Sequence, residues 1–268
     1  MADAQPPNTA HDETPPDETP PDETAPTKTQ RGIRARVRDE LTREIKRSAR
    51  DQLATAGADA LSLRAIARDL DMASSAIYRY FASRDDLLTA LIIDAYDTVG
   101  ALVETAEAAV ARDDHLGRWR TIGTTLRTWA KENPHEYALI YGSPVPGYVA
   151  PADTIGPATR IPAVMLGLLA DVHAAGTEPA TGGGDPEPGD ADGDLGFDEA
   201  TLAELRAIGA FAEADLPPLV VLDGLRAWGE VFGLLSLELF GHFANVITDM
   251  DAFFDNALER SGRAIGAR

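Results

Sequence analysis

The stretch LSLRAIARDLDMASSAIYRYFASRDDLLTALI, residues 61–92, decides the fold of the N-terminal part of this 268-residue chain. Its first part predicts a short helix that Ser62 caps and whose apolar residues share one face. Those residues are Leu63, Ile66, Ala67 and Leu70. Residues 71–73 are expected to form a turn, and a second helix should follow over residues 74–81. Two short helices joined by such a turn constitute a helix-turn-helix motif.

The second helix of the motif has an inner and an outer face. Ser74 is expected to cap it, and Ile77 and Phe81 should turn inward. The outer face presents the polar residues Ser75, Tyr78 and Arg79. A helix exposed in this way fits the major groove of DNA, which is about 12 Å wide. For Tyr78 and Tyr80, packing against the first helix is the alternative interpretation, because aromatic residues often serve the core of small helical modules.

A third helix is expected from Ser83 to about Arg112. Ser83 and Asp86 have the spacing of a capping box, and the apolar residues that follow are Leu87, Leu88 and Leu91. Arg84 therefore lies at a helix N-terminus, where the helix dipole and free backbone amides favour a phosphate.

A basic helix is expected before the motif, beginning at Arg36 and ending at Gly57. Its apolar stripe consists of Val37, Leu41, Ile45, Ala49 and Leu53. The other faces carry Arg36, Arg38, Arg43, Lys46, Arg47 and Arg50. A charged helix face is usually only solvated. Because this face is rich in one sign and directly precedes the motif, we expect its N-terminal part, with Arg31 and Arg34, to contact phosphates.

The formal charge of −20 is unevenly distributed along the chain. Residues 1–30 carry one base and seven acids, residues 31–84 twelve bases and seven acids, and residues 85–268 eleven bases and thirty acids. Salt screens exposed charges beyond about 8 Å, so a local basic patch can attract phosphates although the remainder is acidic. That acidic remainder still weakens long-range attraction.

Residues 1–30 contain the acidic, Pro-rich repeat DETPP, DETPP, DETAP over residues 12–26. Without aromatic residues, this segment buries too little apolar surface to offset the entropy of ordering, so we expect a disordered tail. The tail either solubilises the chain or, as a phosphate mimic, competes for the adjacent basic residues.

The remainder of the chain is expected to be helical. The expected helices cover residues 118–132, 134–141, 157–174, 201–214, 218–243 and 248–262. No stretch alternates cleanly with period two between hairpin turns, so we expect no sheet. Residues 176–197 are rich in Gly, Pro and Asp and predict a mobile acidic loop. The expected class is all-α, with a helix-turn-helix domain over residues 31–82 and a larger helical domain over residues 83–268.

The segment from Arg36 to Leu91 resembles the DNA-binding signature of the TetR family of bacterial repressors. The Ile-Ala pair of the first helix, the turn, the Tyr-x-x-Phe of the second helix and the basic residue that opens the third all fall in register. One departure is visible, because Asp71 occupies a turn position that usually holds Gly. Asp is among the few residues that tolerate left-handed backbone geometry, so the fold should survive.

The resemblance implies roles for individual residues. The residues that would face bases or nearby phosphates are Arg64, Ser74, Ser75, Tyr78 and Arg79. Tyr80 and Arg84 would contact the DNA backbone. The chemistry agrees, since Arg pairs bidentately with guanine whereas Ser and Tyr hydroxyls discriminate less.

In this family the C-terminal helices form a homodimer and enclose an effector pocket. Residues 132–151 and 227–243 resemble an actinobacterial subgroup with a Trp-His-Gly motif, in which Phe232 here replaces the His. Helices 218–243 and 248–262 have apolar faces that suit a four-helix interface between two subunits, with an ordinary intrachain core as the alternative. These faces hold Leu219, Leu222, Leu225, Val231, Leu235 and Leu239, then Met250, Phe253, Phe254 and Leu258.

The effector pocket is expected within an aromatic set that has few charges. Its members are Trp119, Trp129, Tyr137, Tyr141 and Phe232. Each of them singly is more often a core residue than a ligand contact. The implied effector is a small apolar or aromatic molecule.

Other classes of protein find little support in the sequence. The chain has no Cys, and its five His residues lack metal-ligand spacing, so no metal or cofactor is expected. Catalytic motifs such as Gly-x-Ser-x-Gly are missing, so we expect no enzyme. Charged residues interrupt the apolar residues 218–243, which argues against a membrane span, and the N-terminus does not read as a secretory signal. These features fit a reducing cytoplasm.

The favoured interpretation is a ligand-responsive transcriptional regulator. A homodimer would bind a palindromic double-stranded DNA operator, repress transcription and leave the DNA when it binds its small-molecule effector. A transcriptional activator is one alternative. A helical small-molecule-binding protein with a vestigial DNA-binding module is another.

Overall fold

The computed structural model describes Met1 and residues 28–176, 196–211 and 216–268, without the side chains of residues 28–31. The chain divides into two compact units, Met1–Thr42 and Arg43–Arg268. Within the described ranges every regular element is a helix, which confirms the all-α class. The acidic repeat, and all but the ends of the expected loop 176–197, lie outside the described residues.

The helices of the N-terminal part are α1 (Lys28–Ala56), the 3₁₀ helix η1 (Ala58–Ala60), α2 (Leu63–Asp69) and α3 (Ser74–Ile77). Helix α1 begins earlier than the predicted start at Arg36, because its first turns contain Arg, Gln and Lys, which favour helix without burial. The apolar stripe is fully buried only from Ile45 onward, and Val37 is exposed. Gly57 follows α1 with a φ of 77°, as the predicted helix end requires.

The larger helices are α4 (Arg84–Ala108), α5 (His115–Glu132), α6 (Pro134–Tyr141), η2 (Ala152–Thr154), α7 (Ile155–Ala158), α8 (Arg160–Ala174), α9 (Glu199–Ala210), α10 (Pro218–Leu239) and α11 (Met250–Ala264). Helix α5 starts before the predicted residue 118, because the Asp114 carboxylate accepts from Gly117 N–H at 2.8 Å and caps it. The predicted helix 157–174 is interrupted at Thr159. Helix α10 ends four residues before the predicted residue 243, and Gly241 follows with a φ of 78°.

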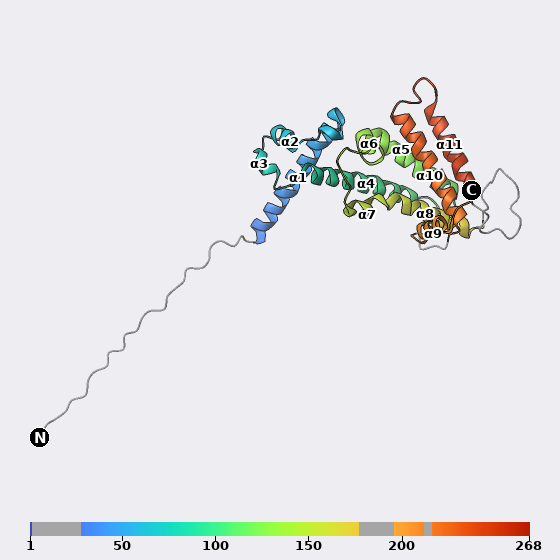
Figure 1. The fold of residues 1–268 in the computed structure, drawn as a ribbon, viewed down its shortest axis with the longest axis horizontal. Coiled ribbons are helices and arrows are strands. Elements are labelled where there is room, and N and C mark those ends of the chain that lie inside the picture. The colour runs from blue at the N-terminus through green and yellow to red at the C-terminus, as the bar shows by residue number, and fades with distance from the viewer. Residues whose placement is uncertain (2–27, 177–195, 212–215) are drawn as a thin grey trace. The chain divides into compact units, whose positions relative to one another are not determined.

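Two buried clusters organise residues Arg43–Arg268. The first unites the C-terminal half of α1 with α2, α3 and the start of α4. Its members include Ile45, Ala49, Leu53, Ile66, Ile77, Phe81, Leu88 and Ile92. From Ala95 onward, α4 contributes to the second cluster instead. Figure 1 shows α4 extending from this first cluster into the bundle of α5, α8, α10 and α11. One helix therefore belongs to both cores.

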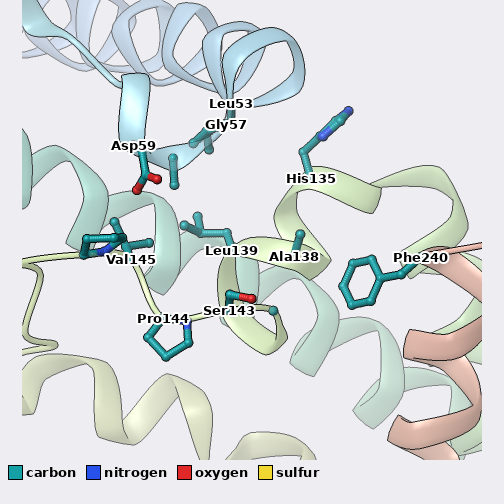
Figure 2. A pocket seen from close by; sticks show the side chains of 13 residues that line it. Leu53, Gly57, Asp59, His135, Ala138, Leu139, Ser143, Pro144, Val145 and Phe240 are labelled. Atoms are coloured by element: carbon teal, nitrogen blue, oxygen red, sulfur yellow. The ribbon is translucent and has the colours of Figure 1, made fainter.

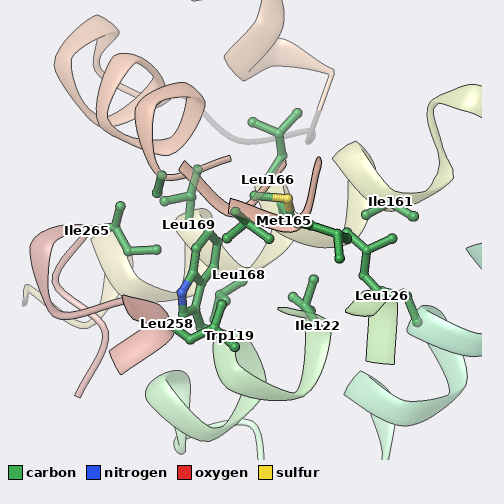
Figure 3. Close-up of a cluster of buried hydrophobic side chains, with 14 of the residues drawn as sticks. Trp119, Ile122, Leu126, Ile161, Met165, Leu166, Leu168, Leu169, Leu258 and Ile265 are labelled. Atoms are coloured by element: carbon green, nitrogen blue, oxygen red, sulfur yellow. The ribbon is translucent and has the colours of Figure 1, made fainter. Parts of the chain in front are cut away.

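The second cluster is built around Trp119 of α5. Figure 3 shows Trp119 among Leu168 of α8 and Leu258 and Ile265, which lie in α11 and at its C-terminal end. The indole Nε1 of Trp119 donates to Ser261 Oγ at 3.1 Å. This bond satisfies the polar atom of a side chain that is otherwise enclosed by apolar atoms.

No single helix of the described residues is long and apolar enough to cross a membrane. The bent pair formed by residues 152–158 and α8 meets the length and composition criteria together. Helix α8, however, buries Ile161, Met165, Leu168 and Leu169 in the second cluster, as a core helix does.

Candidate DNA-binding site and helical core

Local sequence fixes the geometry of the helix-turn-helix. Ser62 Oγ accepts from Ala65 N–H at 3.4 Å, which confirms the predicted cap of α2. The turn enters the left-handed region at Asp71, whose φ is 52°, and Met72 N–H donates to Ala67 O at 2.7 Å. Asp tolerates this conformation where the family usually has Gly, so the departure leaves the turn intact.

Helix α3 differs from the prediction at both ends. Ala73 is its N-cap residue and makes no side-chain cap hydrogen bond, so the prediction that Ser74 caps the helix is wrong. The reason is that the turn already ends at Ala73, which is extended, and Ser74 is helical. The regular helix ends at Ile77 instead of continuing to Phe81, and the chain tightens there, since Tyr80 N–H donates to Ile77 O at 2.9 Å.

The residues predicted to contact DNA lie on the exposed side of the motif. Arg64 on α2 is exposed, and so are Ser74, Ser75, Tyr78 and Arg79 on and after α3. Ile77 and Phe81 are buried. Four of the five exposed side chains thus follow one another on a single short segment, whose inner face is anchored in the first core.

The two tyrosines have different environments. Tyr78 leaves 45% of its surface exposed, whereas Tyr80 is half-buried and packs against the first core. The packing interpretation that the sequence left open for both rings therefore applies to Tyr80, and the Tyr78 ring remains accessible.

Arg84 opens α4, and Ser83 Oγ accepts from Asp86 N–H at 3.0 Å, as the predicted capping spacing requires. The Arg84 guanidinium donates to Ala58 O at 2.8 Å and to Asp85 at 3.2 Å. It thereby ties the start of α4 to η1. A guanidinium has five N–H donors, so these two bonds leave donors for a phosphate.

The expected basic arm is exposed where it is described. Arg34, Arg36 and Arg38 are exposed on the N-terminal part of α1, and the side chain of Arg31 lies outside the described part of the chain.

Two residues of the basic face, Lys46 and Arg50, make ion pairs within the chain. Lys46 binds Asp94 of α4 at 2.8 Å, and Arg50 binds the same carboxylate at 3.0 Å. Arg50 also binds Glu136 at the start of α6. We call these four side chains the α1 clamp. No pattern along the sequence indicates this clamp, because each of its ion pairs joins residues 44 to 86 positions apart.

The larger domain contains a chain of touching aromatic rings. The centroid of Tyr141 lies 5.3 Å from that of Tyr137 and 4.4 Å from that of Phe232, and Phe232 lies 4.3 Å from Trp228. Burial raises the pKa of Tyr141. Three of the five predicted effector residues therefore meet. Trp228 was not predicted to belong to this set. It lies four residues before Phe232, so both side chains lie on one face of α10.

The remaining two predicted effector residues, Trp119 and Trp129, are both buried, with 2% of the surface of each exposed. Trp119 lines a cavity of about 10 Å³ that Met165 and Trp228 also line, and these two residues line a second apolar cavity of about 90 Å³. The Nε1 of Trp129 is buried and has no hydrogen-bond acceptor among the described residues. An unpaired buried donor of this kind costs about 1–3 kcal/mol.

The predicted dimer helices divide their apolar residues between core and surface. Val231, Leu235, Phe254 and Leu258 are buried within the chain. Leu225 and Leu237 on α10 and Phe253 on α11 are exposed instead. Gly229 and Gly233 lie on the same face of α10 as these leucines, and a Cβ at either glycine would meet nothing within 4 Å. Of the ten predicted residues, four are thus buried within the chain, four are half-buried, and Leu225 and Phe253 are exposed.

The fold and the exposed second helix together define a helix-turn-helix DNA-binding transcriptional regulator with an additional helical domain. The chain matches the family description "Bacterial regulatory proteins, tetR family" over residues 45–91. Residues 119–261 match "Tetracyclin repressor-like, C-terminal domain". The chain belongs to the TetR family, and it is a regulator and not an enzyme.

Curated relatives agree with this assignment. The chain is 38% identical over 226 residues to HTH-type transcriptional regulator Rv1816 of Mycobacterium tuberculosis, covering 84% of this chain and 92% of the relative. The same values apply to HTH-type transcriptional regulator Mb1846 of Mycobacterium bovis.

Solved structures share the fold. The regulatory protein SCO4313 is 35% identical, with a TM-score of 0.67 and coverage of 85% of this chain and 97% of that chain. A tetR family transcription regulator from Shewanella sp. PV-4 is 16% identical, with a TM-score of 0.52, and covers 81% of this chain and 93% of that chain. At that identity the likeness concerns the fold alone.

Proposed function

We propose that this regulator is a repressor that binds a palindromic operator as a homodimer and leaves it when a small apolar or aromatic effector binds. The observation that carries the DNA-reading part is the exposed segment Ser74–Arg79, held by the buried Ile77. Arg79 supplies the group best suited to pair with guanine, and Ser75 and Tyr78 supply less selective hydroxyls. Arg64 and the exposed Arg34, Arg36 and Arg38 supply phosphate contacts. We place this activity in the cytoplasm, where bacterial DNA lies.

The proposed dimer uses the exposed face of α10 with α11. Leu225 and Leu237 flank two glycines that allow a second helix to approach closely, and Phe253 adds an exposed ring from α11. Two such helices from each subunit would form a four-helix interface with a twofold axis. A dimer then presents two copies of α3 to successive major grooves, about 34–36 Å apart.

The dimer is tested by sedimentation of the full chain. Gly233→Arg places a long charged side chain in the proposed interface and is expected to shift the chain to monomer. Leu102→Arg is the matched control, because Leu102 is a comparably exposed apolar residue on α4. A monomeric wild type, or a dimer that Gly233→Arg leaves intact, overturns the proposed interface.

The proposed effector site lies between α5, α8 and α10. The two small cavities there share Met165 and Trp228, so a change in the flexible Met165 side chain would join them into one apolar pocket. The chain of Trp228, Phe232 and Tyr141 extends this lining toward α6.

Footprinting on DNA from the chain's own promoter, followed by transcription in vitro from that promoter, tests the whole proposal. We expect two protected half-sites about one helical turn apart and less transcript when the protein is added. Protection with increased transcript shows an activator instead. No protection at any ionic strength contradicts the DNA-binding role.

A further inference from the structure

A cavity of about 540 Å³ lies where the helix-turn-helix module meets α6, and the effector site proposed above does not use it. Residues 53–59, at the end of α1 and in η1, form one wall. Residues 135–139 of α6 and the loop 142–146 form the others, and Phe240 stands at one side. We call this space the junction cavity. Its volume falls within the range of about 300–1,000 Å³ that small-molecule sites occupy.

The body of the junction cavity is apolar. Leu53 is buried, and Leu139 and Val145 are half-buried and pack against the first core. Figure 2 shows Leu139 near the middle of the cavity, Val145 on the side of Asp59, and the ring of Phe240 on the opposite side, directed toward Ala138. Such a lining favours the aromatic or aliphatic part of a ligand.

The polar part of the lining accepts hydrogen bonds more than it donates them. The carboxylate of Asp59 is directed toward Leu139 and Val145, whereas the ring of His135 points outward (Figure 2). Pro144 and Pro146 have no N–H, so the loop 142–146 has five carbonyl groups but three N–H groups, and the N–H of Gly142 already donates to Ala138 O at 2.9 Å. Ser143 adds a hydroxyl, which can accept.

The guanidinium of Arg84, which lies at the wall of the junction cavity, is already paired. Arg84 reaches the wall where it donates to Ala58 O, but the same guanidinium binds Asp85 at 3.2 Å. The Asp59 carboxylate is therefore the charge that a ligand in the junction cavity would meet. An ammonium group complements both the negative charge of Asp59 and the excess of hydrogen-bond acceptors in the lining.

We propose that the junction cavity is a second small-molecule site, which binds an organic amine with an aromatic or aliphatic body. The ammonium group binds Asp59 and the carbonyl groups of the loop 142–146, and the apolar body lies against Leu139 and Val145. The two walls belong to the DNA-binding module and to the larger domain.

Occupancy of this site also affects the DNA-binding module. Helix α6 carries His135, Ala138 and Leu139 on the cavity wall, and its Glu136 holds Arg50 in the α1 clamp. A ligand that moves α6 away from residues 53–59 therefore acts on the same two elements that the clamp joins. This coupling rests on the proposed function, whereas binding to the cavity does not.

Ligand-observed NMR titrations of the full chain without DNA test the site. The probes are 2-phenylethylamine, the neutral 2-phenylethanol and the anionic 3-phenylpropionate, which share a phenyl body. We expect the amine to bind best, and Asp59→Asn to weaken it about tenfold, as the loss of one charge-assisted hydrogen bond implies. Asp113→Asn is the matched control, because Asp113 is also exposed but lies outside the cavity.

Two further measurements keep the test independent of folding. Asp59→Lys reverses the charge of an exposed residue, so it should abolish amine binding while the circular dichroism spectrum and melting temperature stay unchanged. All three Trp residues lie in the second core or on α10, outside the junction cavity. The amine can therefore change tryptophan emission only through α6, and any such change should disappear in Asp59→Lys.

The outcomes separate cleanly. Equal binding of the amine by wild type and Asp59→Asn, equal binding of alcohol and amine, or no amine binding by wild type overturns the site. A tryptophan shift that saturates with the amine in Asp59→Lys as it does in wild type places the amine in the second core and overturns the site as well. If the amine binds the cavity but leaves DNA affinity unchanged in wild type, the coupling is wrong and the site stands.

Discussion

The two cores of this regulator differ in how far apart along the chain their contacting residues lie. The first core gathers most of its residues from Ile45–Ile92, and the side chains proposed to read DNA lie exposed on its surface. The second core joins distant segments, as in the bond between Trp119 and Ser261, which are 142 residues apart. Its predicted effector residues are themselves core members. Local sequence therefore specifies the helix-turn-helix, whereas packing between distant segments specifies the region of the proposed effector site.

The largest effect is expected where the second core buries a charge. Arg118 is 1% exposed in its side chain and binds Glu107 and Asp171, and Arg112 binds the same two carboxylates but is 64% exposed. Arg118→Ala should lower the free energy of unfolding by about 3–5 kcal/mol, because it removes the buried partner of Glu107 and leaves that buried carboxylate with the exposed Arg112 alone. Arg112→Ala should cost about 0–1 kcal/mol.

Urea denaturation of both variants measures this difference. Equal losses for Arg112→Ala and Arg118→Ala would show that burial does not distinguish the two pairs. DNA affinity at low denaturant should remain that of the wild type in each case, since neither residue belongs to the first core.

A smaller effect is expected in the first core, from the cap of α2. Ser62→Ala removes the acceptor for Ala65 N–H and should cost about 1 kcal/mol of stability. Ser74→Ala should stay within about 0.5 kcal/mol of wild type, because Ser74 is an exposed helical residue and not a cap. Thermal melting of the two variants checks this. A larger loss of stability for Ser74→Ala would contradict this account and support Ser74 as the cap of α3.

The smallest effect concerns pH. The guanidinium of Arg160 holds the pKa of Glu104 below its ordinary value of 4.5. As the pH falls, Glu104 is therefore protonated in the unfolded chain at a higher pH than in the folded chain. The pair stabilises the fold at pH above 4.5, and this contribution is lost as the pH falls through the lower folded pKa. Melting temperatures of wild type and Glu104→Gln should therefore differ slightly at neutral pH and converge in acid. A difference that persists at pH 2 would contradict this origin.

Much of the helix-turn-helix could be predicted because the residues that determine it lie close together in the sequence. The Ser62 cap, the tolerance of Asp71 for the left-handed turn and the inward Ile77 follow from neighbours within a few residues. The Ser74 cap was wrong because a single residue decides where a turn ends, and Ala73 carries no side-chain signal for it.

Features formed by distant residues gave no such signal. The pairing of Arg50 with Glu136 spans 86 positions, and the junction cavity depends on where η1 and the loop 142–146 meet. The sequence grouped Tyr137, Tyr141 and Phe232 only as members of an aromatic set with few charges. It could not predict that the rings of α6 meet the ring of Phe232 on α10.

The most direct test of the central claim is the affinity for an operator relative to scrambled DNA of the same length, measured by fluorescence anisotropy over a salt series. Wild type should bind the operator about 10³-fold or more tightly than the scrambled DNA. Arg79→Ala should reduce that ratio about 10- to 100-fold, and Arg206→Ala on α9 should leave it unchanged. A wild-type ratio near one, or a ratio that Arg79→Ala does not alter, would contradict the assignment of α3 as the element that reads DNA sequence.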